Sequence, residues 1–152
     1  MKINTYFFSL MLLIIFLDQI TKYLVLNYML NSFSEISIFP FLNITLVFNS
    51  GVAFGILQNF GQNLPFILTS LGFFLGICIV IWSLYNKKYY TAMALISGGA
   101  FGNAIDRFRL GVVIDYIDVF WKNLHWPAFN IADISICIGA LIFLYSELRK
   151  KV

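Results

Sequence analysis

The sequence contains few charged residues. Asp, Glu, Lys and Arg make up 11% of the 152 residues, whereas about one-quarter of a typical soluble domain is charged. Hydrophobic residues make up 61% and aromatic residues 18%, and the formal net charge is only +3. The few, dispersed basic residues exclude a nucleic-acid-binding surface, and the composition as a whole excludes an ordinary soluble domain. It indicates an integral membrane protein.

The chain also lacks the residue clusters of disulfide scaffolds and metal sites. Its two cysteines, Cys78 and Cys137, lie within apolar segments, and no C-x-x-C motif is present. We therefore expect both thiols to be buried as small hydrophobic side chains, and we expect no metal site. The single histidine, His125, stands near Trp121 and Trp126. We interpret it as a residue of the membrane interface rather than a general base.

Four apolar segments are long enough to cross a bilayer, which requires about 20 residues per helix. They cover residues 6–28, 64–85, 91–108 and 128–145. No A-x-A-like cleavage site follows the first segment, so we expect an uncleaved helix and not a removed signal peptide. The predicted fold class is an all-α membrane protein, with one domain over residues 1–152 that forms a four-transmembrane-helix bundle.

Lysine and arginine are absent between Tyr23 and Asn86. Basic residues gather instead near the two termini and in the short turn at residues 86–90, which places these parts on the cytoplasmic side of the membrane. Residues 29–63 and 109–127 are then expected to be extracytoplasmic.

The segment at residues 29–63 differs from a plain linker. Apolar residues occupy every second position from Leu42 to Phe48, which predicts short β-strands that lie against the outer membrane surface. Asn49 and Gly51 follow in a predicted turn. There the glycine permits close approach of the backbone, and the asparagine amide can donate to a peptide carbonyl.

Several ionisable residues fall within or beside the predicted spans, where they are costly and mark ion pairs, pathways or chemistry. Asp18 and Lys22 are four residues apart on one helix, so they can form an ion pair, and Lys22 can also contact an anionic group. Asp106 and Arg107 are adjacent and point about 100° apart on a helix. We expect each of them to pair elsewhere and to brace neighbouring helices.

Asp115 and Asp133 have no cationic neighbour in the sequence. They stand at the outer ends of consecutive elements, so adjacent antiparallel helices would bring their carboxylates face to face. Two such carboxylates in a low-dielectric site share one proton, which is the chemistry of aspartic hydrolysis. Asp118 remains an alternative to Asp115, because the two residues share one face of a helix but lie on opposite faces of a strand.

Two other functions are compatible with these carboxylates. A proton-coupled carrier would alternate a membrane carboxylate between a proton and a cationic substrate. A structural membrane subunit would use its acids only to pair with Lys22, Arg107 and Arg109.

Five sequence blocks, in this order, cover most of the chain and resemble lipoprotein signal peptidase, the bacterial signal peptidase II family. They are DQITK (18–22), NSGVAFG (49–55), GGAFGNAIDR (98–107), VIDYID (113–118) and FNIAD (129–133). The resemblance implies an intramembrane aspartyl endopeptidase of the bacterial cytoplasmic membrane. Such an enzyme cuts a prolipoprotein before its diacylglyceryl cysteine and requires no cofactor.

The resemblance also implies roles for individual residues. The catalytic pair maps onto Asp115 and Asp133. Residues that line the site, bind substrate or support it map onto Asn49, Gly51, Asn103, Arg107, Asn130, Asp18 and Lys22. The departures from the family pattern are apolar, Val52 and Phe101, and leave the chemistry in place. We expect a monomer whose partners are the prolipoprotein substrate and membrane lipids.

Overall fold

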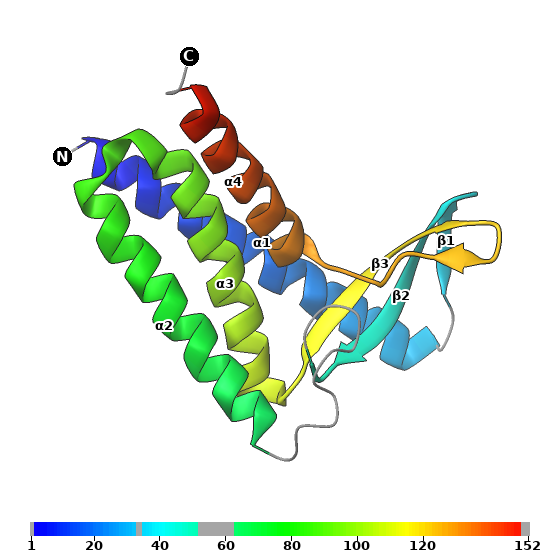
Figure 1. Ribbon diagram of the computed structural model, residues 1–152. Helices are drawn as coiled ribbons and strands as arrows, with labels where there is room; N and C mark the ends of the chain where they lie inside the picture. The colour runs from blue at the N-terminus through cyan, green and yellow to red at the C-terminus, as the bar shows by residue number, and fades with distance from the viewer. Residues whose placement is uncertain (1, 33–34, 52–62, 150–152) are drawn as a thin grey trace.

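The computed structural model describes residues 2–32, 35–51 and 63–149. Within these residues it contains four long helices and a short 3-10 turn. They are α1 (Lys2–Ser32), α2 (Leu64–Tyr85), the 3-10 turn η2 (Lys87–Tyr89), α3 (Tyr90–Leu110) and α4 (Ile131–Leu148). Both termini and the α2–α3 connection lie at the same end of the helical bundle (Figure 1).

Three of the four helices are long and apolar enough to cross a membrane. These candidate spans are Asn4–Ser32, Leu64–Tyr85 and Ile131–Leu148. The remaining helix, α3, packs against α1, α2 and α4 and therefore has protein on most of its sides. Because its surface is covered by other helices, it tolerates small and polar residues that a lipid-facing helix would exclude. The described chain is a helical membrane protein with three clear candidate spans, rather than the four apolar spans that were predicted.

Glycines let the helices around α3 approach closely. A Cβ on Gly102 of α3 would lie 2.6 Å from Asp18 Oδ2 of α1, and a Cβ on Gly139 of α4 would lie 2.7 Å from the carbonyl oxygen of Ala92. At the far end of α3, Gly111 adopts φ +75° and accepts the left-handed conformation that ends the helix. After this break the chain enters β3 directly.

Four antiparallel strands form one sheet beside the helices. They are β1 (Ile36–Phe39), β2 (Leu42–Asn49), β3 (Val113–Trp121) and β4 (Leu124–His125), in the spatial order β1-β2-β3-β4. The strands predicted within residues 29–63 are confirmed. The expectation of an otherwise all-α chain is wrong, because residues 109–127 supply β3 and β4. The β-branched residues around Asp115 pair with β2 across a long stretch of sequence.

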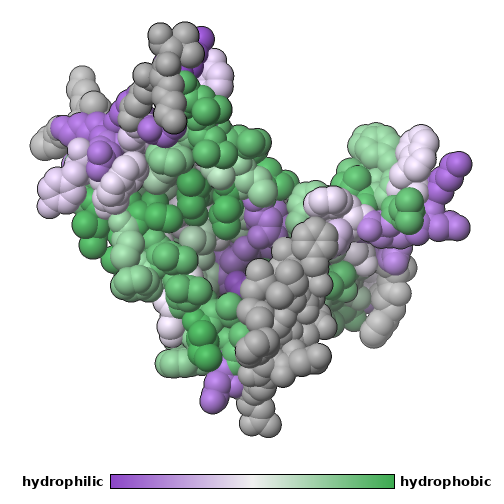
Figure 2. Space-filling model, in the orientation of Figure 1, coloured by the Kyte–Doolittle hydropathy of each residue, from purple (hydrophilic) through white to green (hydrophobic). Residues whose placement is uncertain are grey.

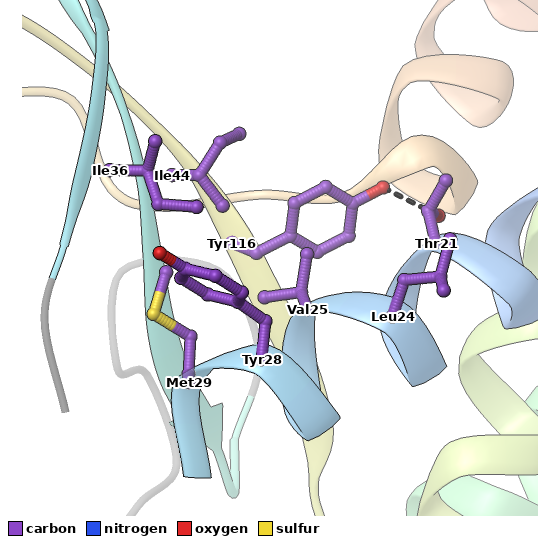
Figure 3. Close-up of a pocket in the computed structure, with 8 residues that line it drawn as sticks. All are labelled: Thr21, Leu24, Val25, Tyr28, Met29, Ile36, Ile44 and Tyr116. Carbon is purple, nitrogen blue, oxygen red and sulfur yellow. Dashed lines mark hydrogen bonds between the residues drawn. The ribbon is translucent and has the colours of Figure 1, made fainter. Parts of the chain in front are cut away.

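The strand β3 separates two hollows. Asp115 faces a cleft that contains other charged and amide side chains, while its neighbour Tyr116 faces an apolar hollow of about 360 Å³ between α1 and the sheet. Figure 3 shows the Tyr116 ring among aliphatic side chains, with its hydroxyl directed at Thr21, to which it donates at 2.7 Å. The polar end of Tyr116 is thus satisfied, and β3 is tied to α1.

The surface of α1, α2 and α4 is largely apolar. Exposed side chains include Phe16, Phe66, Phe74 and Leu141, which fits helices surrounded by lipid. Cys78 and Cys137 are also exposed, so the prediction that both thiols are buried is wrong. An apolar run in a membrane helix faces lipid as readily as protein, and hydropathy alone does not separate the two.

Candidate active site

A cleft of about 1100 Å³ lies between the helices and the sheet. Figure 2 shows hydrophilic residues gathered in the hollow between the helical bundle and the sheet, with hydrophobic surface around them. Among the described residues, the polar lining consists of Asn49, Asn103, Arg107, Asp115 and Asp133, all of which were predicted as site residues. Much of the apolar lining comes from the segment before α4 and from α4 itself, including Trp126, Phe129, Ile134, Cys137 and Ile138.

Asp115 lies in the buried part of β3 and is 2% exposed. Its Oδ2 accepts from Asn49 Nδ2 at 2.9 Å, and its Oδ1 accepts from Asn130 Nδ2 at 2.6 Å. Burial raises the pKa of Asp115 to about 6, and the negative charge of Asp133 adds to the rise, while the two amide donors act in the opposite direction. Asp115 therefore holds a proton at mildly acidic pH.

Asp133 occupies the first turn of α4, where a capping box fixes it. The Asn130 side chain accepts from the backbone N–H of Asp133 at 2.9 Å, and the Asp133 carboxylate accepts from the backbone N–H of Asn130 at 3.3 Å. Asn103 Nδ2 of α3 donates to Asp133 Oδ1 at 2.8 Å. A carboxylate at a helix N-terminus is also favoured by the helix dipole. The capping box and the Asn103 amide together fix the orientation of the Asp133 carboxylate in the cleft.

Asn130 connects the two carboxylates. Its side chain is fully buried, and its Nδ2 lies 2.6 Å from Asp115 Oδ1 and 3.1 Å from Asn103 Oδ1. Its Oδ1 and backbone N–H serve Asp133. The predicted pairing therefore takes the form of two carboxylates in one cleft that share Asn130. Asp115 lies on a strand, however, so the expectation of two facing helices is wrong.

Arg107 supplies a cation that the sequence around the two carboxylates lacks. It lines the same cleft, and its Nη2 donates to the carbonyl oxygen of Gly51 at 2.8 Å. The Gly51 N–H donates to Asn49 Oδ1 at 3.0 Å, which confirms the predicted turn. The Arg107 Nε is buried and has no hydrogen-bond partner among the described residues. This arrangement joins the end of β2 to α3 beside Asp115.

Asp18 and Lys22 form the predicted ion pair, at 2.8 Å, and both are almost completely buried. They lie behind the cleft rather than in its lining. Lys22 Nζ also lies 2.9 Å from Asp106 Oδ2 and donates to Asn103 Oδ1 at 2.9 Å. The predicted brace by Asp106 is confirmed, with Lys22 of α1 as its partner. Lys22 is thus two hydrogen bonds away from Asp133, with Asn103 between them.

Asp118 belongs to a different part of the sheet. Both of its carboxylate oxygens lie 2.9 Å from His125 Nδ1, and the His125 ring stacks on Phe120. The described residues that line the cleft include Asp115 but not Asp118. The extended alternative for this segment is therefore correct, and Asp115, rather than Asp118, lies in the same cleft as Asp133. His125 therefore contacts Asp118 and Phe120 at the end of the sheet where β3 pairs with β4.

Gln19 is the main residue of this region that sequence reasoning missed. Its Nε2 lies 2.9 Å from Asp106 Oδ1 and 3.2 Å from Asp18 Oδ2. The only signal in the sequence is its position between Asp18 and Lys22 in a predicted span, where a polar amide needs buried partners. Those partners lie on α3, more than 80 residues away, so local spacing does not reveal them.

The geometry is suited to acid–base chemistry on a substrate that enters from an apolar environment. One carboxyl group is shielded from water and has a raised pKa, and a second carboxylate lies in the same cleft. Amide and guanidinium donors surround both. Such a pair can hold one proton between its members, take a proton from water and return it to a leaving group.

Comparison with known proteins agrees with this chemistry. Residues 10–149 match the family model described as signal peptidase (SPase) II. The lipoprotein signal peptidase of Polynucleobacter necessarius is 40% identical over 149 residues, which cover 95% of this chain and 90% of that protein. The lipoprotein signal peptidase of Thermodesulfovibrio yellowstonii is 42% identical over 144 residues, which cover 91% of each chain.

Two solved structures of bacterial membrane enzymes have the same fold. One has a TM-score of 0.74 and 30% identity, with 97% of this chain and 90% of that chain covered. The other has a TM-score of 0.77 and 29% identity, with 95% and 93% covered. From the family match over most of its length and from these relatives, we conclude that the chain belongs to the signal peptidase II family.

Proposed function

We propose that this chain removes the signal peptide from diacylglyceryl-modified prolipoproteins at the outer face of the bacterial cytoplasmic membrane, with Asp115 and Asp133 as its catalytic pair. Family membership makes the chain an aspartic endopeptidase and decides against a proton-coupled carrier. The observation that carries the choice of residues is the shared cleft, in which Asn130 hydrogen-bonds to both carboxyl groups.

The reaction begins with one proton on the pair. Because burial favours the neutral form of Asp115, we assign the proton to Asp115, while Asp133 starts ionised. Asp133 takes a proton from water as the water oxygen bonds to the scissile carbonyl carbon. Asp115 gives its proton to the carbonyl oxygen at the same time. This step forms a neutral tetrahedral diol and reverses the protonation of the pair.

Collapse of the diol completes the cycle. The C–N bond breaks, and Asp133 gives its proton to the leaving nitrogen, which becomes the amino group of the lipid-modified cysteine. Asp115 recovers a proton from a diol hydroxyl as the new carboxyl group forms. Both carboxyl groups end in their starting protonation states, so no cofactor is required.

The substrate reaches this site through the lipid side of the cleft. Ile134 and Ile138 line the cleft, are 36% and 46% exposed, and belong to α4, a helix long and apolar enough to cross the membrane. The cleft is therefore continuous with an apolar helix surface, along which acyl chains can enter without exposure to water. Arg107 Nε, which is buried and lacks a partner among the described residues, is a donor for a carbonyl oxygen of the bound peptide.

We further propose that α3 crosses the membrane together with α1, α2 and α4, so that the chain spans the bilayer four times as a single domain. Residues 29–63 and 109–127 then lie outside, and both termini lie in the cytoplasm. Two observations support this topology. The termini and the Lys87–Lys88 turn lie at one end of the bundle, and the sheet lies away from that end (Figure 1). Because both carboxyl groups and the amide and guanidinium donors beside them come from the same chain, the site needs no second copy, and we propose a monomer that contacts only substrate and lipid.

The test is cleavage of a diacylglyceryl-modified prolipoprotein by the purified protein in detergent. We expect Asp115→Asn and Asp133→Asn each to abolish cleavage while the thermal unfolding temperature and membrane insertion are retained. Asp118→Asn serves as the matched control, since it removes a carboxylate from the same strand outside the cleft. Full activity of a folded Asp133→Asn protein would refute the assignment.

A further inference from the structure

Each proposed catalytic aspartate follows a residue whose backbone N–H is held by a buried carboxylate. Asp106 Oδ2 accepts from the N–H of Ile114, the residue before Asp115, at 3.1 Å. Asp18 Oδ1 accepts from the N–H of Ala132, the residue before Asp133, at 2.9 Å. The start of β3 and the start of α4 are thus each anchored to a different helix, β3 to α3 and α4 to α1.

A single ammonium group joins the two anchors. Lys22 Nζ lies 2.8 Å from Asp18 Oδ2 and 2.9 Å from Asp106 Oδ2, and it donates to Asn103 Oδ1 at 2.9 Å. An ammonium has three donors, and three acceptors surround it here. Lys22 is only 2% exposed, so water does not compete for these bonds. The Gln19 amide repeats the connection between the same two carboxylates.

This arrangement restrains the distance between the start of β3 and the start of α4. The bonds run in one line, from the backbone before Asp115 through Asp106, Lys22 and Asp18 to the backbone before Asp133. Hydrogen bonds between charged groups are short and stiff, and in a buried site they are strengthened further. The backbone segments that carry Asp115 and Asp133 can therefore change their separation only if this line breaks or stretches.

We propose that Lys22 and Asp106 are positioning residues of the peptidase, and that the Lys22 ammonium sets the separation of the Asp115 and Asp133 carboxylates through Asp106 and Asp18. The inference rests on the proposed catalytic pair. A simple brace between α1 and α3 is the competing explanation, and it predicts that activity follows stability. Positioning predicts instead that turnover falls even when stability is restored.

The experiment compares Lys22→Met, the double variant Lys22→Met/Asp106→Asn, and Tyr90→Phe. Lys22→Met leaves two buried carboxylates without their cation, which lowers stability. The double variant returns the cluster to its original formal charge of −1, since one cation and one anion are removed together, but it does not rebuild the line of bonds. Tyr90→Phe is the matched control, because Tyr90 also joins α3 to α1, with a 2.7 Å bond to Asn4 far from the cleft.

The readouts are the unfolding temperature in detergent, kcat and KM for a lipid-modified prolipoprotein, and the pH dependence of kcat/KM. A displacement of about 1 Å in a reacting group lowers rates on the order of 100-fold. We expect kcat of Lys22→Met to fall by roughly that factor, with KM changed less than about threefold. The double variant should regain much of the lost unfolding temperature but not kcat, and Tyr90→Phe should keep its kcat.

The pH profile adds a readout of the Lys22 charge at Asp115. Three charged groups face Asp115, namely Asp133 of α4, Arg107 of α3 and Lys22 of α1. The Lys22 charge lowers the pKa of Asp115, so its loss should move the basic limb of kcat/KM to higher pH. In Tyr90→Phe the limb should stay in place.

Three outcomes are decisive. Recovery of kcat together with the unfolding temperature in the double variant would leave Lys22 as a brace and overturn the inference. If Lys22→Met fails to fold, Gln19→Leu replaces it in the test, because this change removes the second link between the Asp18 and Asp106 carboxylates. We then expect a severalfold loss of kcat. An unchanged kcat would count against positioning. Activity of Asp115→Asn and Asp133→Asn in the same assay would instead refute the proposed catalytic pair itself.

Discussion

Replacement of Asn49 by alanine should move the pH dependence of catalysis in a known direction. Asn49 Nδ2 donates to Asp115 Oδ2 at 2.9 Å and stabilises the ionised carboxylate. A hydrogen bond to a charged group contributes about 1.5–3 kcal/mol, and one pKa unit corresponds to about 1.4 kcal/mol. Because Asn49 is partly exposed, water replaces some of the lost interaction, and the lower end of that range applies. We therefore expect the pKa of Asp115 to rise by about one unit.

The sign of the effect follows from the role of the shared proton. The pair is active while it holds one proton, and that proton is lost as the pH rises through the pKa of Asp115, which is about 6 in the wild type. A higher pKa keeps the proton in place for longer, so the basic limb of kcat/KM should move from about pH 6 to about pH 7. The assay is cleavage of a lipid-modified prolipoprotein from pH 4 to pH 9.

Asn43→Ala provides the matched control. Asn43 lies on the same strand and is also partly exposed, but it pairs with Asp118 rather than with Asp115. Its removal should leave the position of the limb unchanged. A basic limb that stays in place or moves to lower pH in Asn49→Ala would refute the reasoning, whatever happens to the maximal rate.

Three further predictions concern the pH dependence of stability, the packing of α3 against α1, and the choice between Asp115 and Asp118. Burial raises the pKa of Asp115 from 3.8 to about 6, so its contribution to stability is present at low pH and is lost as the pH rises between these values. Asp115→Asn lacks this pH dependence. The difference in unfolding free energy between Asp115→Asn and the wild type should therefore shift in favour of the variant by up to about 3 kcal/mol from pH 3 to pH 7, as measured by denaturation in detergent. Gly102→Ala would place its Cβ 2.6 Å from Asp18 Oδ2, so both the unfolding temperature and kcat should fall, whereas Ala100→Gly on the same helix should leave kcat unchanged. Asp118→Asn weakens the contact with His125 and should reduce cleavage severalfold without abolishing it, and an inactive, folded Asp118→Asn would reopen the choice of catalytic residue.

The helices were predictable because their apolar runs are long and clearly ended. The second span was placed at residues 64–85, the bounds of α2, where an uncharged run opens with Pro65 in the first turn. α3 was located almost as well, but its central position was not apparent. Small residues such as Gly99 and Gly102 show this position only once the neighbouring helices are in place.

The sheet was only half predictable. The alternation from Leu42 to Phe48 identified β2, whereas the spacing of Asp115 and Asp118 was compatible with either a helix or a strand. Pairing with β2, a contact between segments more than 60 residues apart, decided in favour of the strand. Such long-range pairing has no local signal.

The centre of the site was predictable from unusual charges, but its support was not. Asp133 was predicted as a site residue because no cation stands near it in the sequence, whereas the capping box that it forms with Asn130 was not predicted. The bonds that Lys22, Gln19 and Arg107 make reach residues on other elements. Their partners become known only when α1, α3 and the sheet are assembled.

The positions of the two cysteines have a practical consequence for ligand studies. Cys137 lies one turn after Asp133 and lines the cleft, whereas Cys78 is exposed on α2 and is not among the described residues of the cleft lining. The wild-type chain thus contains both a thiol reporter of cleft occupancy and an internal reference. In detergent, a maleimide should label each thiol at a rate set by its access to water, and a bound peptide or inhibitor should slow the labelling of Cys137 alone. Because both thiols belong to the same chain, the ratio of the two labels measures the occupancy of the cleft without any engineered cysteine.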